Sequence, residues 1–259
     1  MKYTHASQIP PEVNERLEAI AKGQSAFCVP VIILESDQAL PRDILCSGSM
    51  TLIQTPQRQI FVTSHHVWAK YLEVKQRCSS AVFSAYLGSV YGFVVLTALE
   101  YLDGDEKTLD MAILHTPGIG NIPLVDKGFF RIPTWPIPKA CVGEAVMTVG
   151  YPSVHRGLLP NGIDLGYSHF GFSISSVSER HFVAANELND RLFAQKDSGD
   201  PNVFSIGGMS GSPAFIYRDR ITHLVGFLYE GETSHNTIFF SHAAFLKPDG
   251  TLDHLAIPH

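Results

Sequence analysis

Features that would place the chain in several functional classes are missing from this 259-residue sequence. Its longest apolar runs, 26–34 and 93–99, are far shorter than the roughly 20 residues of a membrane helix and are typical of buried strands. The 19 basic residues form no cluster and are outnumbered by 25 acidic ones, so we expect neither nucleic acid nor a membrane as a partner. No apolar core follows the first basic residue, which predicts a cytoplasmic protein without a secretory signal.

Patterns for metal binding and for a disulfide framework are missing as well. The 12 histidines include no H-E-x-x-H motif and no paired Cys/His spacing. The four cysteines (Cys28, Cys46, Cys78 and Cys141) show no C-x-x-C spacing and are expected to be reduced. The sequence therefore predicts no metal and no cofactor.

Strand-like segments occupy most of the chain. A short amphipathic helix, with apolar residues at spacings of three and four, ends at Gly23. Runs rich in Val, Ile, Phe and Thr follow it, separated by turn residues. Six of these runs precede residue 116: 27–34, 48–54, 59–63, 81–84, 92–100 and 111–115. Six more follow residue 138: 145–149, 171–177, 182–185, 212–216, 222–229 and 237–240. The proline- and glycine-rich segment 116–138 joins the two all-β halves.

The segment 207–213, Gly-Gly-Met-Ser-Gly-Ser-Pro, holds a serine between glycines. The amides of Gly208 and Ser210 have no bulky side chains to shield them and could point at one spot beside the Ser210 hydroxyl. Acyl transfer needs this combination of a nucleophile and donors for the oxyanion. A tight glycine-rich turn between two strands would explain the same residues. This segment alone leaves both interpretations open.

Two other polar features adjoin strand-like runs. His65 and His66 follow Thr63, and a histidine there could act as a general base because its ordinary pKa lies near neutrality. A pair of polar turn residues is the alternative interpretation. Asp110 precedes the apolar residues 111–114, and a buried carboxylate is costly unless it is paired. The alternative is an Asp110 that ends a turn and faces solvent.

The order His66, Asp110, Ser210, each in its local context, resembles the chymotrypsin-fold serine proteases, also called trypsin-like peptidases. The matching segments occur in the family's order between about residues 27 and 240: 48–53, 62–67, 110–114, 143–152 and 208–213. The resemblance implies an all-β fold of two six-stranded antiparallel β-barrels, with the site in the cleft between them. It implies five parts: an N-terminal helical extension (1–26), a first barrel (27–117), a crossover linker (118–138), a second barrel (139–242) and a C-terminal tail (243–259).

The resemblance also implies a role for each residue of the site. His66 is the implied general base, Asp110 orients its ring, and Ser210 is the nucleophile. The amides of Gly208 and Ser210 form the implied oxyanion hole, and His65 is a structural neighbour. The implied reaction is hydrolysis of a peptide bond in a protein or peptide substrate through an acyl-enzyme.

The implied substrate pocket lies between the residues before the serine motif and the strand that follows it. Its walls are Phe204, Ser205 and Ile206 on one side and Tyr229, Glu230 and Gly231 on the other. Phe204 stands where relatives that select Lys or Arg have an acid. We therefore expect an apolar or small uncharged side chain before the cleaved bond, with Glu230 at the mouth of the cleft.

The chain departs from the secreted members of the family in two respects. No cysteines bracket the histidine and serine motifs, and Met209 stands where those members have an aspartate that captures a new N-terminal amine. The sequence thus predicts a protease of the intracellular or bacterial branch that needs no N-terminal cleavage. A catalytically idle domain that binds proteins is the alternative function, because a sequence does not show whether the oxyanion loop is ordered.

Overall fold

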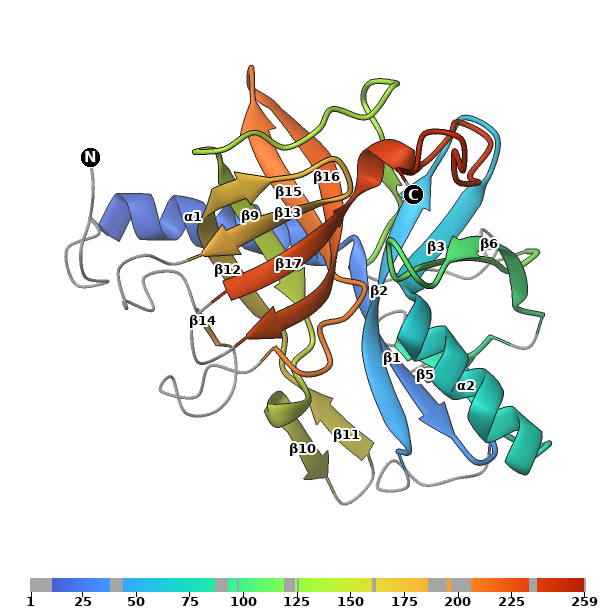
Figure 1. Cartoon of the computed structure of the whole chain (residues 1–259). Helices are drawn as coiled ribbons and strands as arrows, with labels where there is room; N and C mark the ends of the chain where they lie inside the picture. The colour runs from blue at the N-terminus through green and yellow to red at the C-terminus, as the bar shows by residue number, and fades with distance from the viewer. Residues whose placement is uncertain are drawn as a thin grey trace.

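The fold consists of two β-sheets side by side with two α-helices, as expected of a chymotrypsin-like double barrel (Figure 1). The computed structural model describes residues 11–37, 44–86, 93–96, 98–118, 124, 126–159, 162–185, 195–196, 206–232 and 237–258. Within these residues, neither helix is long and apolar enough to cross a membrane.

The first sheet is curled into a half-barrel in the order β5-β4-β1-β2-β3-β7-β6, and β8 pairs with β2 in parallel. Its strands are β1 (Cys28–Leu34), β2 (Cys46–Gln54), β3 (Gln59–Ser64), β4 (Val82–Tyr86), β5 (Phe93–Val95), β6 (Glu100–Asp105), β7 (Met111–His115) and β8 (Phe130–Arg131). The single strand expected over 92–100 is in fact two. β5 and β6 lie at opposite edges of the sheet, so the chain crosses its open side between them.

Six of the seven strands of the second sheet close into a barrel, and the seventh, β14, pairs with β12 outside the ring. The order is β13-β17-β16-β15-β9-β12-β14, and an additional pairing of β12 with β13 completes the ring. Its strands are β9 (Ala145–Gly150), β12 (Ser168–Val177), β13 (His181–Ala185), β14 (Gln195–Lys196), β15 (Pro213–Arg218), β16 (Ile221–Glu232) and β17 (Thr237–His242). A separate hairpin consists of β10 (Arg156–Leu159) and β11 (Gly162–Leu165), which follow the 3-10 turn η4 (Ser153–His155).

Side chains along the strands of the first sheet alternate between its two faces and contribute to two separate hydrophobic cores. Leu52 and Phe61 pack on one face, together with residues of the helix that follows β3. Ile53 and Ile60, their neighbours in sequence, point to the other face and pack against the second sheet, including Phe227. Successive side chains of a strand point to opposite faces, so one sheet can serve both cores.

Helix α1 (Pro11–Ser25) carries the N-terminal amphipathic pattern and lies against β9 and β1 (Figure 1). Helix α2 (His65–Arg77) begins directly after β3, where the sequence was interpreted as a turn. Its Val67, Trp68 and Val74 are buried against the half-barrel. The turn interpretation is therefore wrong, because the apolar spacing after His66 continues as a helix.

The C-terminal segment, which sequence patterns left unassigned, packs against the first sheet. The 3-10 turn η5 (Ala243–Phe245) leads into a short bridge that pairs Leu246 with Leu252. Both leucines are buried, and they join the core that lies between the two sheets. The tail thereby stabilises the arrangement of the sheets.

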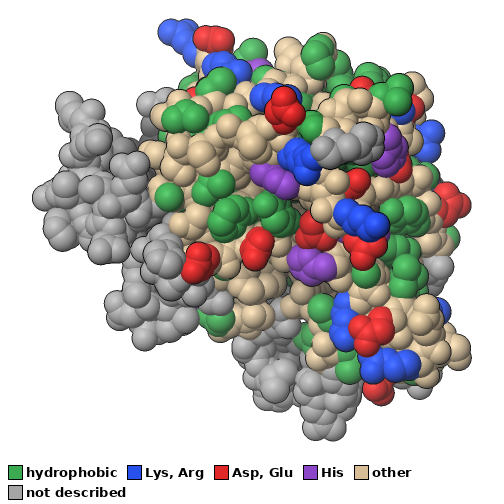
Figure 2. All heavy atoms as spheres, in the orientation of Figure 1, with side chains coloured by type: hydrophobic (Ala, Val, Ile, Leu, Met, Phe, Trp, Pro, Cys, Tyr) green, Lys and Arg blue, Asp and Glu red, His purple; other side chains and the backbone are tan. Residues whose placement is uncertain are grey.

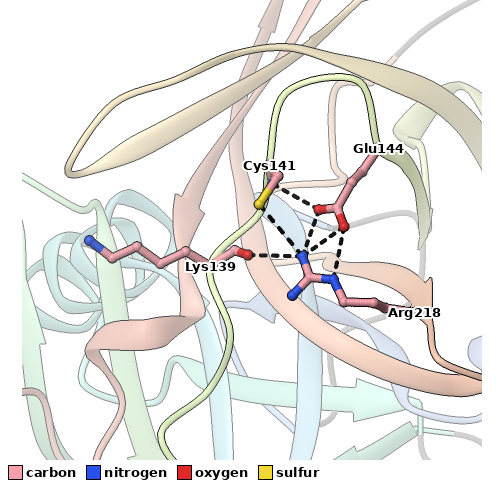
Figure 3. A network of polar contacts seen from close by, with 4 residues as sticks. All are labelled: Lys139, Cys141, Glu144 and Arg218. Carbon is pink, nitrogen blue, oxygen red and sulfur yellow. Dashed lines mark hydrogen bonds and ion pairs between the residues drawn. The ribbon is translucent and has the colours of Figure 1, made fainter.

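A polar network connects residues 139–144, which follow the linker, to β15 (Figure 3). Arg218 of β15 donates from Nε and Nη2 to Glu144, with the shortest contact at 2.7 Å. Its Nη2 also donates to the Lys139 carbonyl at 3.3 Å and lies 3.8 Å from the Cys141 sulfur. Glu144 in turn accepts from the Cys141 amide at 2.8 Å. The guanidinium group of Arg218 thus fixes residues 139–144, where the chain enters the second barrel.

Candidate active site

His66 and Asp110 meet because β3 pairs with β7. The register places Ser64 opposite Met111, so Asp110, which precedes β7, lies beside His65 and His66 at the start of α2. The Nδ1 atom of His66 lies 2.6 Å from Oδ2 of Asp110. The backbone amide of His66 donates to Oδ1 of the same carboxylate at 2.9 Å. This two-point contact fixes the histidine ring, and within the described part of the chain its Nε2 makes no hydrogen bond.

Asp110 is held in an unusual backbone conformation that turns its side chain toward His66. Its φ of 47° lies in the left-handed region, which aspartate tolerates better than most residues. Its carbonyl accepts a hydrogen bond from the His65 amide at 3.0 Å. The carboxylate side chain is 20% exposed, whereas the His66 side chain is 53% exposed. Asp110 therefore faces the histidine more than the solvent.

His65 is oriented away from this pair. Its ring makes an edge-on contact with Tyr101 of β6, at a centroid separation of 6.3 Å. Tyr101 also stacks on Trp68 of α2. The ring of His65 thus belongs to the packing of α2 on the half-barrel, and only its backbone contributes to the site.

The Ser210 loop and the end of β3, which precedes His66, are joined through β16. The carbonyl of Leu228 in β16 accepts from the Gly211 amide at 2.7 Å and from the Ser64 hydroxyl at 3.2 Å. The carbonyl of Ser210 accepts from the Ser49 amide at 2.9 Å. Gly211 has a φ of 94°, and a Cβ there would collide with the Ser49 carbonyl, so glycine is required. These contacts bring the loop to the junction of the two sheets.

Among the residues that the structure describes, two amides at the serine have no hydrogen-bond partner. The amides of Met209, Gly211 and Ser212 each donate to a backbone carbonyl, at 2.9, 2.7 and 2.9 Å. Within the part of the chain that the structure describes, the amides of Gly208 and Ser210 donate to no acceptor. Over the same residues, no hydrogen bond joins the Ser210 hydroxyl to the His66 ring. On the face shown in Figure 2, histidine and acidic side chains lie close together beside hydrophobic ones.

The expected substrate pocket is described only in part. Phe204 and Ser205 lie outside the described residues. Ile206 is buried, and its side chain covers the position that a Cβ on Gly231 would take. Glu230 is exposed at the end of β16.

Tyr229, between Leu228 and Glu230, is half-buried. Its ring packs against His181 at a centroid separation of 4.9 Å and against Phe239 at 6.3 Å. Burial, together with the charges of Glu230 and Asp110, raises the pKa of Tyr229 to about 12. The hydroxyl therefore stays protonated. The hydrogen bond from Ser64 to the Leu228 carbonyl places this part of β16 beside the end of β3.

Three residues around the serine loop were not predicted to belong to the site. Ser49 contacts the loop and Tyr151, and Lys127 contacts Tyr151. Ser49 and Tyr151 lie in segments that resemble the protease family, which is the only signal that could have suggested them. No local pattern marks Lys127, because its partners come from distant parts of the chain.

No protein-family model and no curated protein matches the sequence. Chymotrypsin-fold serine proteases are among the solved structures that are similar to it. The thermostable serine protease AL20 from an extremophilic microorganism is 16% identical over 85% of this chain and 92% of that chain, with a TM-score of 0.49. The Rv3671c protease from M. tuberculosis, in its active form, is 17% identical over 91% and 82%, with a TM-score of 0.48. A Glu endopeptidase is 17% identical over 82% and 84%, with a TM-score of 0.47. The double-barrel fold itself is established by the strand pairing of this chain.

Proposed function

We propose that this protein is a serine endopeptidase that hydrolyses peptide bonds in a protein or peptide substrate. The observation that supports the proposal most directly is the two-point contact between His66 and Asp110. It lies where the loop of Ser210 and the Ser64 hydroxyl both donate to the Leu228 carbonyl. A base with a fixed ring, a nearby serine and unpartnered amides are the parts that acyl transfer requires.

In the proposed mechanism, the Ser210 hydroxyl attacks the substrate carbonyl and its proton passes to Nε2 of His66. Asp110 accepts the Nδ1 proton of His66 in a hydrogen bond and stabilises the imidazolium. The amides of Gly208 and Ser210 donate to the oxyanion. The imidazolium then protonates the leaving amine, and an acyl-enzyme forms on Ser210. His66 activates water to hydrolyse this ester and release the second product.

Labelling with a fluorophosphonate probe tests the proposal. We expect stoichiometric labelling of Ser210, loss of labelling in Ser210→Ala, and retention in the matched variant Ser212→Ala. The labelled species should be the uncleaved chain beginning at Met1. Met209 is fully buried among apolar residues and offers no carboxylate to an N-terminal amine. Labelling confined to a truncated form would contradict that part of the proposal.

One observation favours a second candidate, a protein-binding domain without catalysis. In the described residues, the Ser210 hydroxyl makes no hydrogen bond to His66. Catalytic hydrogen bonds are often long in the unliganded form and tighten with substrate, so this observation is compatible with both functions. An intact chain that does not react with the probe, and hydrolyses no ester, would select the binding domain.

The proposed specificity is for an apolar or small uncharged side chain before the cleaved bond. Phe204 supplies no charge at the expected pocket floor, and a cation buried without a partner would cost several kcal/mol. Each buried methylene of an apolar side chain would contribute about 0.8 kcal/mol, or roughly fourfold in kcat/KM. A peptide library randomised at this position measures the preference. Selection of Arg or Lys would instead assign Glu230 to the pocket and leave the triad intact.

A further inference from the structure

The Gly208 amide can serve as an oxyanion donor only if the peptide between Gly207 and Gly208 has one particular orientation. Residues 206–209 form a turn in which the Met209 amide donates to the Ile206 carbonyl at 2.9 Å. Gly208, at the third position, has a φ of 92°, which is typical of a type II turn. The middle peptide of such a turn points its carbonyl to one side and its N–H to the other. Two adjacent glycines oppose rotation of that peptide only weakly, so contacts outside the turn must hold it.

Two hydrogen bonds from outside the turn hold it: the first restrains the Gly207–Gly208 peptide itself, and the second restrains the Gly208–Met209 peptide that follows. The carbonyl of Gly207 accepts from the Ser153 amide at 2.6 Å. The carbonyl of Gly208 accepts from the Ser49 hydroxyl at 3.0 Å. The Ser49 hydroxyl is itself oriented by the Tyr151 amide, which donates to it at 3.1 Å. Both restraints therefore depend on where the segment from Tyr151 to Ser153 lies.

Lys127 holds the segment from Tyr151 to Ser153 through the side chain of Tyr151. Its Nζ donates to the Tyr151 hydroxyl at 2.5 Å, to the Ser25 carbonyl at 2.8 Å and to the Cys28 carbonyl at 2.9 Å. Burial lowers the pKa of Lys127 to about 8, although the nearby Cys28 and Asp126 oppose this effect. A lysine in such surroundings is tolerated because oxygen atoms satisfy all three of its donors.

We propose that Lys127, Tyr151 and Ser49 are positioning residues that hold the Gly207–Gly208 peptide with the Gly208 N–H turned toward Ser210. Lys127 fixes the side chain of Tyr151 to the C-terminal end of α1 and to the start of β1. The backbone of Tyr151 and Ser153 then fixes the turn, directly through Gly207 and indirectly through Ser49. The inference rests on the proposed protease function, because it explains how the oxyanion donors of that site are kept in place.

Three substitutions remove one link each: Ser49→Ala, Tyr151→Phe and Lys127→Met. Tyr217→Phe and Lys139→Met are matched controls, since both side chains are exposed on the second barrel and its entrance. Loss of an oxyanion donor lowers kcat by about 100- to 1,000-fold, and partial misalignment should cost about tenfold or more. We expect the largest loss for Ser49→Ala, with KM for a peptide ester unchanged within about twofold.

Two further measurements separate positioning from general destabilisation. Affinity for a peptide boronate, which places an oxygen in the oxyanion hole, should fall in parallel with kcat. Hydrogen exchange followed by mass spectrometry should show faster exchange over residues 206–212, where the Met209 and Ser212 amides are normally bonded. Exchange in the other strands of the second barrel should stay the same.

The outcomes distinguish the two proposals. An active wild-type chain whose three variants keep kcat and boronate affinity would overturn the positioning role and leave the protease function standing. Variants that lose kcat only together with faster exchange throughout the barrel would also overturn it. A wild-type chain inert to the probe would remove the protease function. The exchange measurement would then decide alone, and unchanged exchange over 206–212 would refute the anchoring of the loop.

Discussion

The first sheet carries two histidine–aspartate pairs with nearly the same local geometry. His66 lies 2.6 Å from Asp110, and His254 lies 2.8 Å from Asp103. In both pairs the histidine side chain is 53% exposed and the carboxylate side chain is 20% exposed. Distance and exposure alone would therefore assign the same role to both.

Their surroundings differ. Asp110 contacts Nδ1 of His66 and also the amide of the same histidine, so the second ring nitrogen, Nε2, is not used in the pair. Asp103 contacts Nε2 of His254 and accepts from the Leu252 amide, so it holds the C-terminal tail. The first pair adjoins a serine loop in which two amides have no partner among the described residues, whereas the second adjoins a packed tail. The proposed catalytic role of the first pair therefore rests on its surroundings and not on the histidine–aspartate contact itself.

The largest difference between the pairs should appear when each histidine is removed. His66→Ala and Ser210→Ala should each lower kcat by about a millionfold, and the double variant should be little worse because the residues act as a unit. His254→Ala should keep full activity. Kinetics of the four proteins on one peptide ester check this. Additive losses, or an inactive His65→Ala beside an active His66→Ala, would contradict the assignment.

Replacing the carboxylate of each pair compares the two pairs again, with a smaller expected loss of kcat. Asp110→Asn should lower kcat by about 10,000-fold, because an amide that donates to Nδ1 favours the wrong tautomer of His66. Asp103→Asn should change kcat less than about twofold. Circular dichroism of both variants serves as a control for folding. Equal losses in the two variants would mean that the carboxylates act through stability and not through the ring of His66.

The fold was predictable where local patterns determine it. Runs of β-branched residues between turn residues predicted most strands of both sheets, and 111–115 coincides with β7. The helix α2 was missed although Val67, Tyr71 and Val74 have helical spacing, because the two preceding histidines were interpreted as a turn. The C-terminal tail was not predictable, since Leu246 and Leu252 pair across a bend and show no period.

The site was predictable only in part. Order and local context suggested His66, Asp110 and Ser210, and the register of β3 and β7 explains why the first two meet. The contacts of Lys127 and Ser49 are not visible in the sequence, because their partners lie up to 159 residues away. Long-range contacts of this kind depend on how the two sheets pack, which no local pattern records.

The smallest predicted effect concerns the contribution of the second pair to stability in acid. Burial by itself would raise the pKa of Asp103, but hydrogen bonds from the Leu252 amide, His254 and the Gly104 amide together lower it. A carboxylate whose pKa is lowered by folding stabilises the folded state above its unfolded pKa of about 3.9, and this stabilisation is lost as the pH falls further.

Urea unfolding of the wild type and Asp103→Asn at pH 7, 5 and 3 measures this effect. Because both side chains of the pair are partly exposed, the wild type should be more stable by about 1 kcal/mol or less at pH 7 and 5. The difference should shrink at pH 3, and His254→Ala should show the part of it that the ring contributes. A difference that stays constant down to pH 3 would mean that the Asp103 carboxylate does not hold the tail by its charge, and that the Leu246–Leu252 packing secures it alone.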